Sequence, residues 1–145
     1  MNAFNKILSG VLIAAIILCT GLIIYLSVTP AANDKFTEFY ILNESGKASD
    51  YPFDVKAGQP VRVVLGVVNH EYRTADYKIQ IRQNGAIIKS IIVGPLPDKQ
   101  KWEEKVDFTV EGSGRSQPEF YLFKDNGEAP HIKDPLTLKL NIKDL

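Results

Sequence analysis

The chain has 145 residues, in which 17 lysines and arginines are balanced by 17 aspartates and glutamates, and it contains one cysteine. Lys6 is the only basic residue before residue 34, so the remainder carries 16 basic against 17 acidic side chains. This balance excludes the overall basic field typical of nucleic-acid-binding domains, and a single cysteine excludes an intrachain disulfide framework.

After a short tail at residues 1–6, a run of 22 residues without a charged side chain extends over residues 7–28. As an α-helix it would be about 33 Å long, enough to cross a hydrocarbon core of about 30 Å. The apolar core of a removable signal peptide is shorter, about 7 to 15 residues. We therefore expect a retained, single-pass membrane helix, with cleavage as the alternative.

Charge at the two ends of this helix favours one orientation in the cell membrane. Lys6 directly precedes the apolar run, whereas residues 29–33 after it carry no charge. Because positive charge is enriched on the cytoplasmic side, we expect a cytoplasmic amino terminus and an extracytoplasmic carboxyl domain. Lys35 and Lys47 lie farther along on the outer side and weaken this bias.

Three small residues within the apolar run, Gly10, Ala14 and Gly21, fall on one helical face. Small residues let a second membrane helix approach closely, so this face could support self-association or docking to a membrane complex. Small residues are also common in membrane helices that have no partner. The two interpretations remain open.

Four later segments alternate with the period of two that is typical of β-strands. In the first of them both sets of alternating side chains are apolar, as Val63 and Val64 show, which predicts a central strand covered on both faces. The other three each have one polar face. The four apolar rows are Val61, Val63, Leu65 and Val67; Ala75, Tyr77, Ile79 and Ile81; Trp102, Val106, Phe108 and Val110; and Leu136, Leu138, Leu140 and Ile142.

Weaker strand patterns cover residues 36–42, 86–93 and 119–124. Asn84 and Gly85 tolerate positive φ and predict a tight hairpin before residue 86. No segment after residue 33 has a helical repeat. Seven or eight such strands predict an all-β fold, an immunoglobulin-like antiparallel β-sandwich over residues 36–145, preceded by a linker at residues 29–35. A closed barrel is the alternative.

The segment Gly66-Val67-Val68-Asn69-His70-Glu71-Tyr72 is the most distinctive part of the chain. Together with Phe39-Tyr40-Ile41-Leu42, Lys47-Ala48-Ser49-Asp50-Tyr51-Pro52 and Ala57-Gly58, it resembles a family of archaeal and bacterial membrane proteins known as domain of unknown function 1616. The resemblance implies that relatives often carry several membrane helices before this domain, whereas this sequence has one. The segment is also similar to adhesion-type immunoglobulin-like sandwich modules. Neither resemblance implies a catalytic activity.

Asn69, His70 and Glu71 form the main candidate site. If a turn brought His70 and Glu71 together, they could act as an acid/base or metal-binding pair. Alternatively, Asn69 bonds the nearby backbone and its neighbours shape the loop. Zinc needs at least three protein ligands, and His131 is the only other histidine. We therefore expect neither a metal nor another cofactor.

Tyr51 and Tyr72 are loop aromatics that could contact a sugar or a protein, and Asn43 begins an Asn-Glu-Ser glycosylation pattern. The sequence shows no Ser/His/Asp arrangement and no phosphate-binding loop. The leading hypothesis is a membrane-anchored, non-catalytic recognition or accessory module for an envelope protein or glycan. The alternatives are a subunit or assembly factor of a membrane complex, and a metal-dependent enzyme that uses His70 and Glu71.

Overall fold

The computed structural model describes residues 2–29 and 34–144 and divides the chain into two units, with the boundary after Asp34. The first unit contains α1 (Ala3–Val28), and among the described residues α1 is the one helix long and apolar enough to cross a membrane. It begins four residues before the expected start at Ile7, with the Asn5 and Lys6 amides bonded to the Asn2 carbonyl. Most of the expected linker, residues 29–35, lies outside the described residues.

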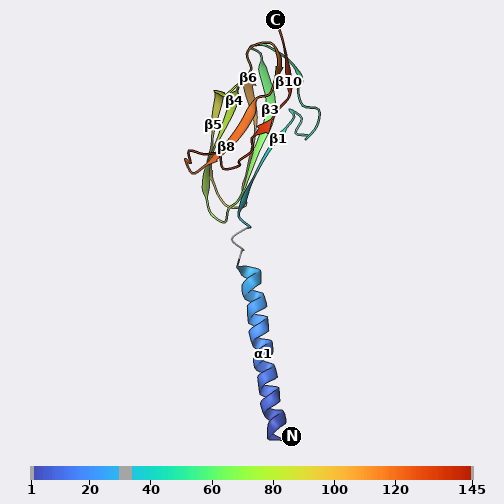
Figure 1. Ribbon diagram of the computed structural model, residues 1–145, viewed down its shortest axis with the longest axis vertical. Coiled ribbons are helices and arrows are strands. Elements are labelled where there is room, and N and C mark those ends of the chain that lie inside the picture. Colours follow the sequence, from blue (N-terminus) through green and yellow to red (C-terminus); the bar gives the residue numbers. More distant parts are fainter. Residues whose placement is uncertain (1, 30–33, 145) are drawn as a thin grey trace. The chain divides into compact units, whose positions relative to one another are not determined.

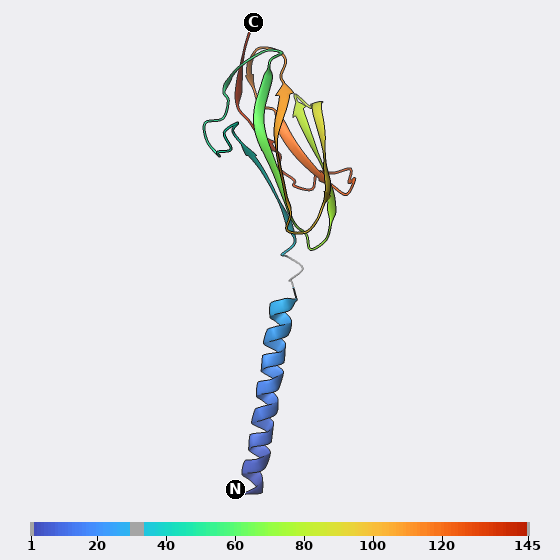
Figure 2. The ribbon, with the colours of Figure 1, turned by 180° about the vertical axis from the view of Figure 1, so that it is seen from behind.

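The second unit is a sandwich of antiparallel sheets, which confirms the predicted all-β, immunoglobulin-like fold (Figures 1 and 2). One sheet has the order β1-β3-β6, formed by β1 (Phe36–Leu42), β3 (Pro60–His70) and β6 (Lys101–Thr109). The facing sheet has the order β5-β4-β8-β9, formed by β4 (Ala75–Gln83), β5 (Ala86–Leu96), β8 (Glu119–Lys124) and β9 (Leu136–Thr137). A third, smaller sheet has the order β2-β10-β7, formed by β2 (Asp54–Lys56), β7 (Gly114–Ser116) and β10 (Leu140–Lys143).

The core lies between the two larger sheets and follows the predicted alternation. The central strand β3 places Val63, Leu65 and Val67 in the core without exposed surface, and Val64 on its other face is also buried. Across the core, the rings of Phe108 and Phe120 meet edge to face with centroids 5.5 Å apart. The β4–β5 hairpin also forms as predicted, because Asn84 and Gly85 both adopt positive φ, at 51° and 82°.

The carboxyl-terminal segment differs from the prediction of one continuous strand over residues 136–142. β9 pairs with β8, whereas β10 pairs antiparallel with β7 and parallel with β2. Between them, the amide of Leu138 donates to the Pro118 carbonyl at 3.2 Å. Leu138, Leu140 and Ile142 are all buried, so the alternation of side chains continues while the pairing partner changes. The alternation of apolar side chains thus predicts which residues are buried, but it does not predict which strand pairs with the segment.

β1 is held to its sheet by an aromatic side chain that lies across a glycine. Tyr40 pairs with Gly66 on β3, and Gly66 pairs with Glu103 on β6. Because Gly66 has no side chain, the Tyr40 ring covers it and its phenol donates to Glu103 at 2.5 Å. Burial, and then the bond to Glu103, raise the pKa of Tyr40 to about 12. One hydrogen bond therefore spans all three strands.

Replacing Gly66 with Ala should destabilise the sandwich, because a Cβ there would overlap the Tyr40 ring. We expect the free energy of unfolding to fall by about 1–3 kcal/mol, the usual cost of overpacking. Chemical denaturation of the full chain in detergent, followed by Trp102 fluorescence, measures it. In the Tyr40→Ala background, Gly66→Ala should cost clearly less. An equal loss in both backgrounds would contradict this packing.

Candidate binding surface

Asn69 is a structural residue of the turn that follows β3. Its side chain has no exposed surface. The amide nitrogen donates to the carbonyls of Arg73 and Leu96 at 2.7 and 2.8 Å, and the amide oxygen accepts from the Glu71 backbone at 2.8 Å. All three bonds go to the backbone, so the interpretation of Asn69 as a residue that orders the local chain is confirmed.

His70 and Glu71 do not form the pair that the catalytic or metal-binding hypothesis required. His70 stacks on Phe36, with ring centroids 4.4 Å apart, and its Nε2 lies 3.0 Å from Glu38 Oε1. Glu71 is buried, with its carboxylate among groups from other elements. Because consecutive residues at a strand end face opposite sides, the two side chains join different clusters.

The Glu71 carboxylate is surrounded by donors from three other parts of the domain. Its Oε1 accepts from Thr37 at 2.9 Å and lies 3.0 Å from His131 Nε2, while Oε2 lies 3.1 Å from Lys124 Nζ. Burial opposes the charged form, but the bonds from Lys124, Thr37 and His131 outweigh it and lower the pKa of Glu71. The carboxylate thus ties β1, β8 and the loop after β8 together.

Across residues 2–29 and 34–144, no group of three or more His, Cys, Asp or Glu side chains could hold a metal ion. Asn43, the first residue of the glycosylation pattern, is buried. Its amide donates to the Ser49 carbonyl at 2.6 Å and accepts from the Lys47 backbone at 2.8 Å. Attachment of a glycan to Nδ2 would have to fit a bulky group beside a side chain that is buried and bonded to the backbone.

The two candidate tyrosines lie in different surroundings. Tyr72 is 44% exposed in the turn after β3, where it adopts a positive φ of 58° and its amide donates to Asp98. Tyr51 is 37% exposed, donates to the Ile41 carbonyl at 2.9 Å, and lines a hollow in the domain. The structure thus places Tyr51, but not the Asn69 segment, beside a hollow large enough for a ligand.

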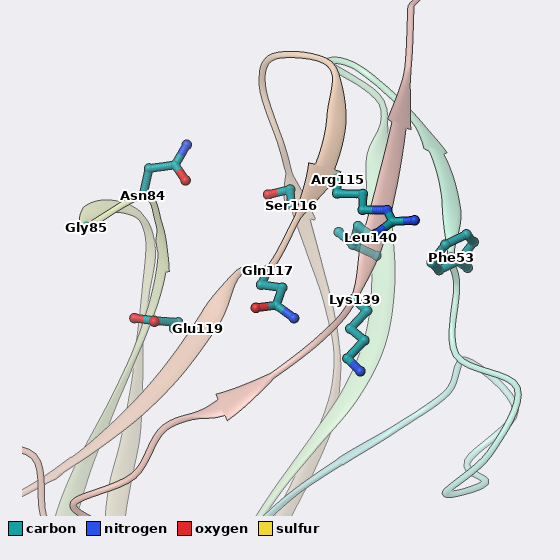
Figure 3. A pocket seen from close by; sticks show the side chains of 9 residues that line it. All are labelled: Phe53, Asn84, Gly85, Arg115, Ser116, Gln117, Glu119, Lys139 and Leu140. Atoms are coloured by element: carbon teal, nitrogen blue, oxygen red, sulfur yellow. The ribbon is translucent and has the colours of Figure 1, made fainter.

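Two hollows adjoin on the side of the sandwich that carries Phe53 and Lys139. Each has a volume of about 700 Å³, which is within the range of small-molecule sites. Both are lined by Phe53, which is 54% exposed, and by Lys139. The first, here called the edge groove, is mainly apolar and is lined by Phe39, Tyr40, Ile41, Leu42, Ala48, Tyr51, Pro52, Phe53, Leu136, Thr137, Leu138 and Lys139. The second, the polar hollow, is lined by Phe53, Asn84, Gly85, Arg115, Ser116, Gln117, Glu119, Lys139 and Leu140 (Figure 3).

The edge groove lies where both larger sheets end. β1 is the last strand of its sheet and β9 the last strand of the facing sheet. The Ile41 carbonyl bonds to Tyr51, so it faces away from β3. In an antiparallel pair alternate residues share this direction, so the backbone groups of Phe39 face the groove as well. An extended ligand would therefore meet apolar side chains and the backbone groups of Phe39, beside the Ile41 carbonyl that Tyr51 already occupies.

Sequence reasoning found Tyr51 but missed Phe53, Arg115 and Lys139. Phe53 and Arg115 lie beside or within the three-residue strands β2 and β7, which are too short to show an alternation. Lys139 lies on the polar side of the alternation over residues 136–142, which does not indicate that these segments meet. In α1, Gly10, Ala14 and Gly21 are exposed, and a Cβ added at either glycine would meet nothing within 4 Å. No residue of α1 is buried, so this face is exposed as the other faces are.

A family model described as "Domain of unknown function (DUF1616)" matches residues 30–143. Among solved structures, the chain is similar to the CARDB domain of the PF1109 protein from Pyrococcus furiosus, crystallised in complex with di-metal ions. The identity is 14% and the TM-score 0.56, covering 80% of this chain and 99% of that one. The solution structure of that CARDB domain gives 14% identity and a TM-score of 0.51, covering 74% and 96%. No curated protein matches the chain. The likeness to the CARDB domain is one of fold.

Replacing Glu71 with Gln should destabilise the domain, because Lys124, only 19% exposed, would lose its carboxylate. We expect the free energy of unfolding at pH 7 to fall by about 2–4 kcal/mol, as when a largely buried ion pair loses one member. Denaturation of the full chain in detergent measures the loss. Glu128→Gln, which changes an exposed carboxylate near His131, is the matched control and should cost little.

The wild type and Glu71→Gln should differ less in their free energy of unfolding at acidic pH. The pKa of Glu71 in the folded protein lies below its usual value of 4.5, so its contribution to stability is complete above that value. The contribution is lost as the pH falls through the lower, folded-state pKa. The difference between the wild type and Glu71→Gln should therefore shrink below about pH 4. A difference that does not change with pH would contradict the ion-pair account.

Proposed function

The chain belongs to the family of domain of unknown function 1616, and from that premise we propose that it is a membrane-anchored, non-catalytic recognition module. α1 holds it in the cell membrane, and the extracytoplasmic sandwich binds an envelope protein or glycan. The observation that carries the proposal is the pair of hollows that adjoin at Phe53 and Lys139. Together they offer apolar, aromatic and charged groups along one side of the domain.

The geometry of this surface suits binding better than bond-breaking. Its lining contains one carboxylate, Glu119, and no histidine or cysteine. The carboxylate accepts a hydrogen bond from the Tyr121 phenol at 2.6 Å. General acid–base catalysis needs convergent groups placed around a substrate atom. Within the described residues, the buried Glu71 cluster offers two side chains of the kind that bind metals, Glu71 and His131, and no third one completes a site. The proposal therefore includes no metal of the kind bound by the CARDB domain.

Open strand edges support an extended ligand. β1 turns the backbone of Phe39 and Ile41 toward the edge groove, which is the arrangement used by domains that bind a partner segment alongside an edge strand. Exposed aromatic rings such as Phe53 and Tyr51 also suit the apolar faces of sugars. The sequence adds a limit on distance, since the seven residues 29–35 can extend over at most about 25 Å. The tether therefore limits how far the sandwich can move from the bilayer.

Site-specific crosslinking in native membranes tests this proposal. A photoreactive amino acid at position 53 should capture a ligand, because Phe53 lies where the two hollows meet. The same amino acid at position 92 is the matched control, because Ile92 is 74% exposed but lies on β5. Protease or glycosidase treatment of the adduct tells a protein ligand from a glycan. Equal capture at both positions, or none at position 53, would overturn the proposal.

A second candidate function is that of a subunit or assembly factor of a membrane complex. The open face formed by Gly10, Ala14 and Gly21 is the observation that favours it. Leu at these three positions should abolish co-purification of a partner or of a second copy, because bulky side chains prevent close helix approach. Leu at Ala15 and Cys19, on other faces of α1, is the control. Unchanged complexes in the first variant would exclude this role for the face.

A further inference from the structure

The polar hollow contains more positive than negative charge. Arg115 and Lys139 line it, and in the described part of the chain neither forms an ion pair, whereas Arg62 and Arg73 each bind an aspartate. The single carboxylate of the hollow, Glu119, is engaged by Tyr121. Two cations without partners beside one engaged carboxylate leave a net attraction for an anionic group.

The segment that carries Arg115 and Ser116 is fixed in place by a buried amide. Gln83, only 7% exposed at the end of β4, donates to the Glu111 carbonyl at 2.8 Å and to the Ser116 hydroxyl at 3.2 Å. Its oxygen accepts from the Glu111 amide at 3.0 Å. Arg115 then pairs with Asn141 in the β7–β10 ladder. The position of the guanidinium-bearing residue is thus set by the core of the domain.

Phe53 is held on the other side of the hollow. Its carbonyl accepts from the Asn141 amide at 2.7 Å, and the Asn141 side chain donates to Asp54 at 2.9 Å. Figure 3 shows the Arg115 side chain reaching across the strand that carries Leu140 toward Phe53, with Gln117 on the other side of Lys139. Because the backbone of Phe53 is fixed, its exposed ring can stack on a flat apolar face of a ligand with little loss of conformational freedom.

We propose that the polar hollow binds an anionic glycan, with acid groups of the glycan at Arg115 and at Lys139 and a sugar ring against Phe53. The inference rests on the proposed recognition function and names its ligand. The neutral groups of Asn84, Ser116 and Gln117 can both donate and accept hydrogen bonds, as sugar hydroxyls require. An acidic peptide could bond to the same neutral groups through its backbone, but its carboxylate side chains would offer no flat apolar face to the Phe53 ring.

Binding of polygalacturonate, a glycan with a carboxylate on each sugar, tests the proposal with the full chain in nanodiscs of zwitterionic lipid. Calorimetry should show that polygalacturonate binds more tightly than its methyl-esterified, neutral form. Arg115→Gln and Lys139→Gln should each weaken binding about tenfold, the scale of a lost charge-assisted contact. Phe53→Ala should weaken it as well. Lys133→Gln, which removes an exposed charge from a loop outside the hollow, is the matched control and should have no effect.

Two results would overturn this inference. The first is that polygalacturonate binds no better than its neutral ester, or that binding does not respond to Arg115→Gln and Lys139→Gln. The second is that polyglutamate, an anionic polymer without sugars, binds equally well while Phe53→Ala has no effect, which would make the hollow a site for charge alone. Crosslinking from position 53 to an envelope protein, together with either result, would leave the recognition function standing without a glycan ligand.

Discussion

The change of sheet between β9 and β10 is the constraint on which the candidate surface depends. After pairing with β8, the chain leaves that sheet at Thr137 and rejoins strands β2 and β7 at Leu140. This crossing separates the edge groove from the polar hollow and places Lys139 in both. It also brings the segments of Phe53 and Arg115 to either side of one strand, although the two residues are 62 positions apart in the sequence. A continuous last strand would have left the two segments apart.

Buried polar side chains organise the two ends of the sandwich. At the end where β1 begins, Asn69 and Glu71 bond to backbone and side-chain groups of several loops. At the other end, Gln83 does the same for the segment before β7. In the part of the chain that the structure describes, no buried side-chain nitrogen or oxygen lacks a hydrogen-bond partner. Such satisfied groups stabilise a single arrangement of loops, because each would be costly to bury alone.

Features that depend on local chemistry could be predicted from the sequence. The Asn84-Gly85 hairpin, the central position of β3 and the apolar rows of β4 and β6 follow from turn preferences and alternation. Contacts between distant segments could not, because nothing in the pattern around Glu71 indicates His131, 60 residues away. The distinctive Asn69 segment therefore indicated the family and the fold, while the hollow formed elsewhere, where the segments of Phe53, Arg115 and Lys139 meet.

The phenol that reaches across Gly66 has a consequence for tolerance to alkali. An ordinary tyrosine gives up its proton near pH 10, and with it the ability to donate to a carboxylate. Because the pKa of Tyr40 is about 12 in the folded protein, its bond to Glu103 is complete below pH 10 and is lost only as the pH rises through about 12. The bond between Tyr40 and Glu103 thus persists at pH values at which an unprotected tyrosine would already be ionised.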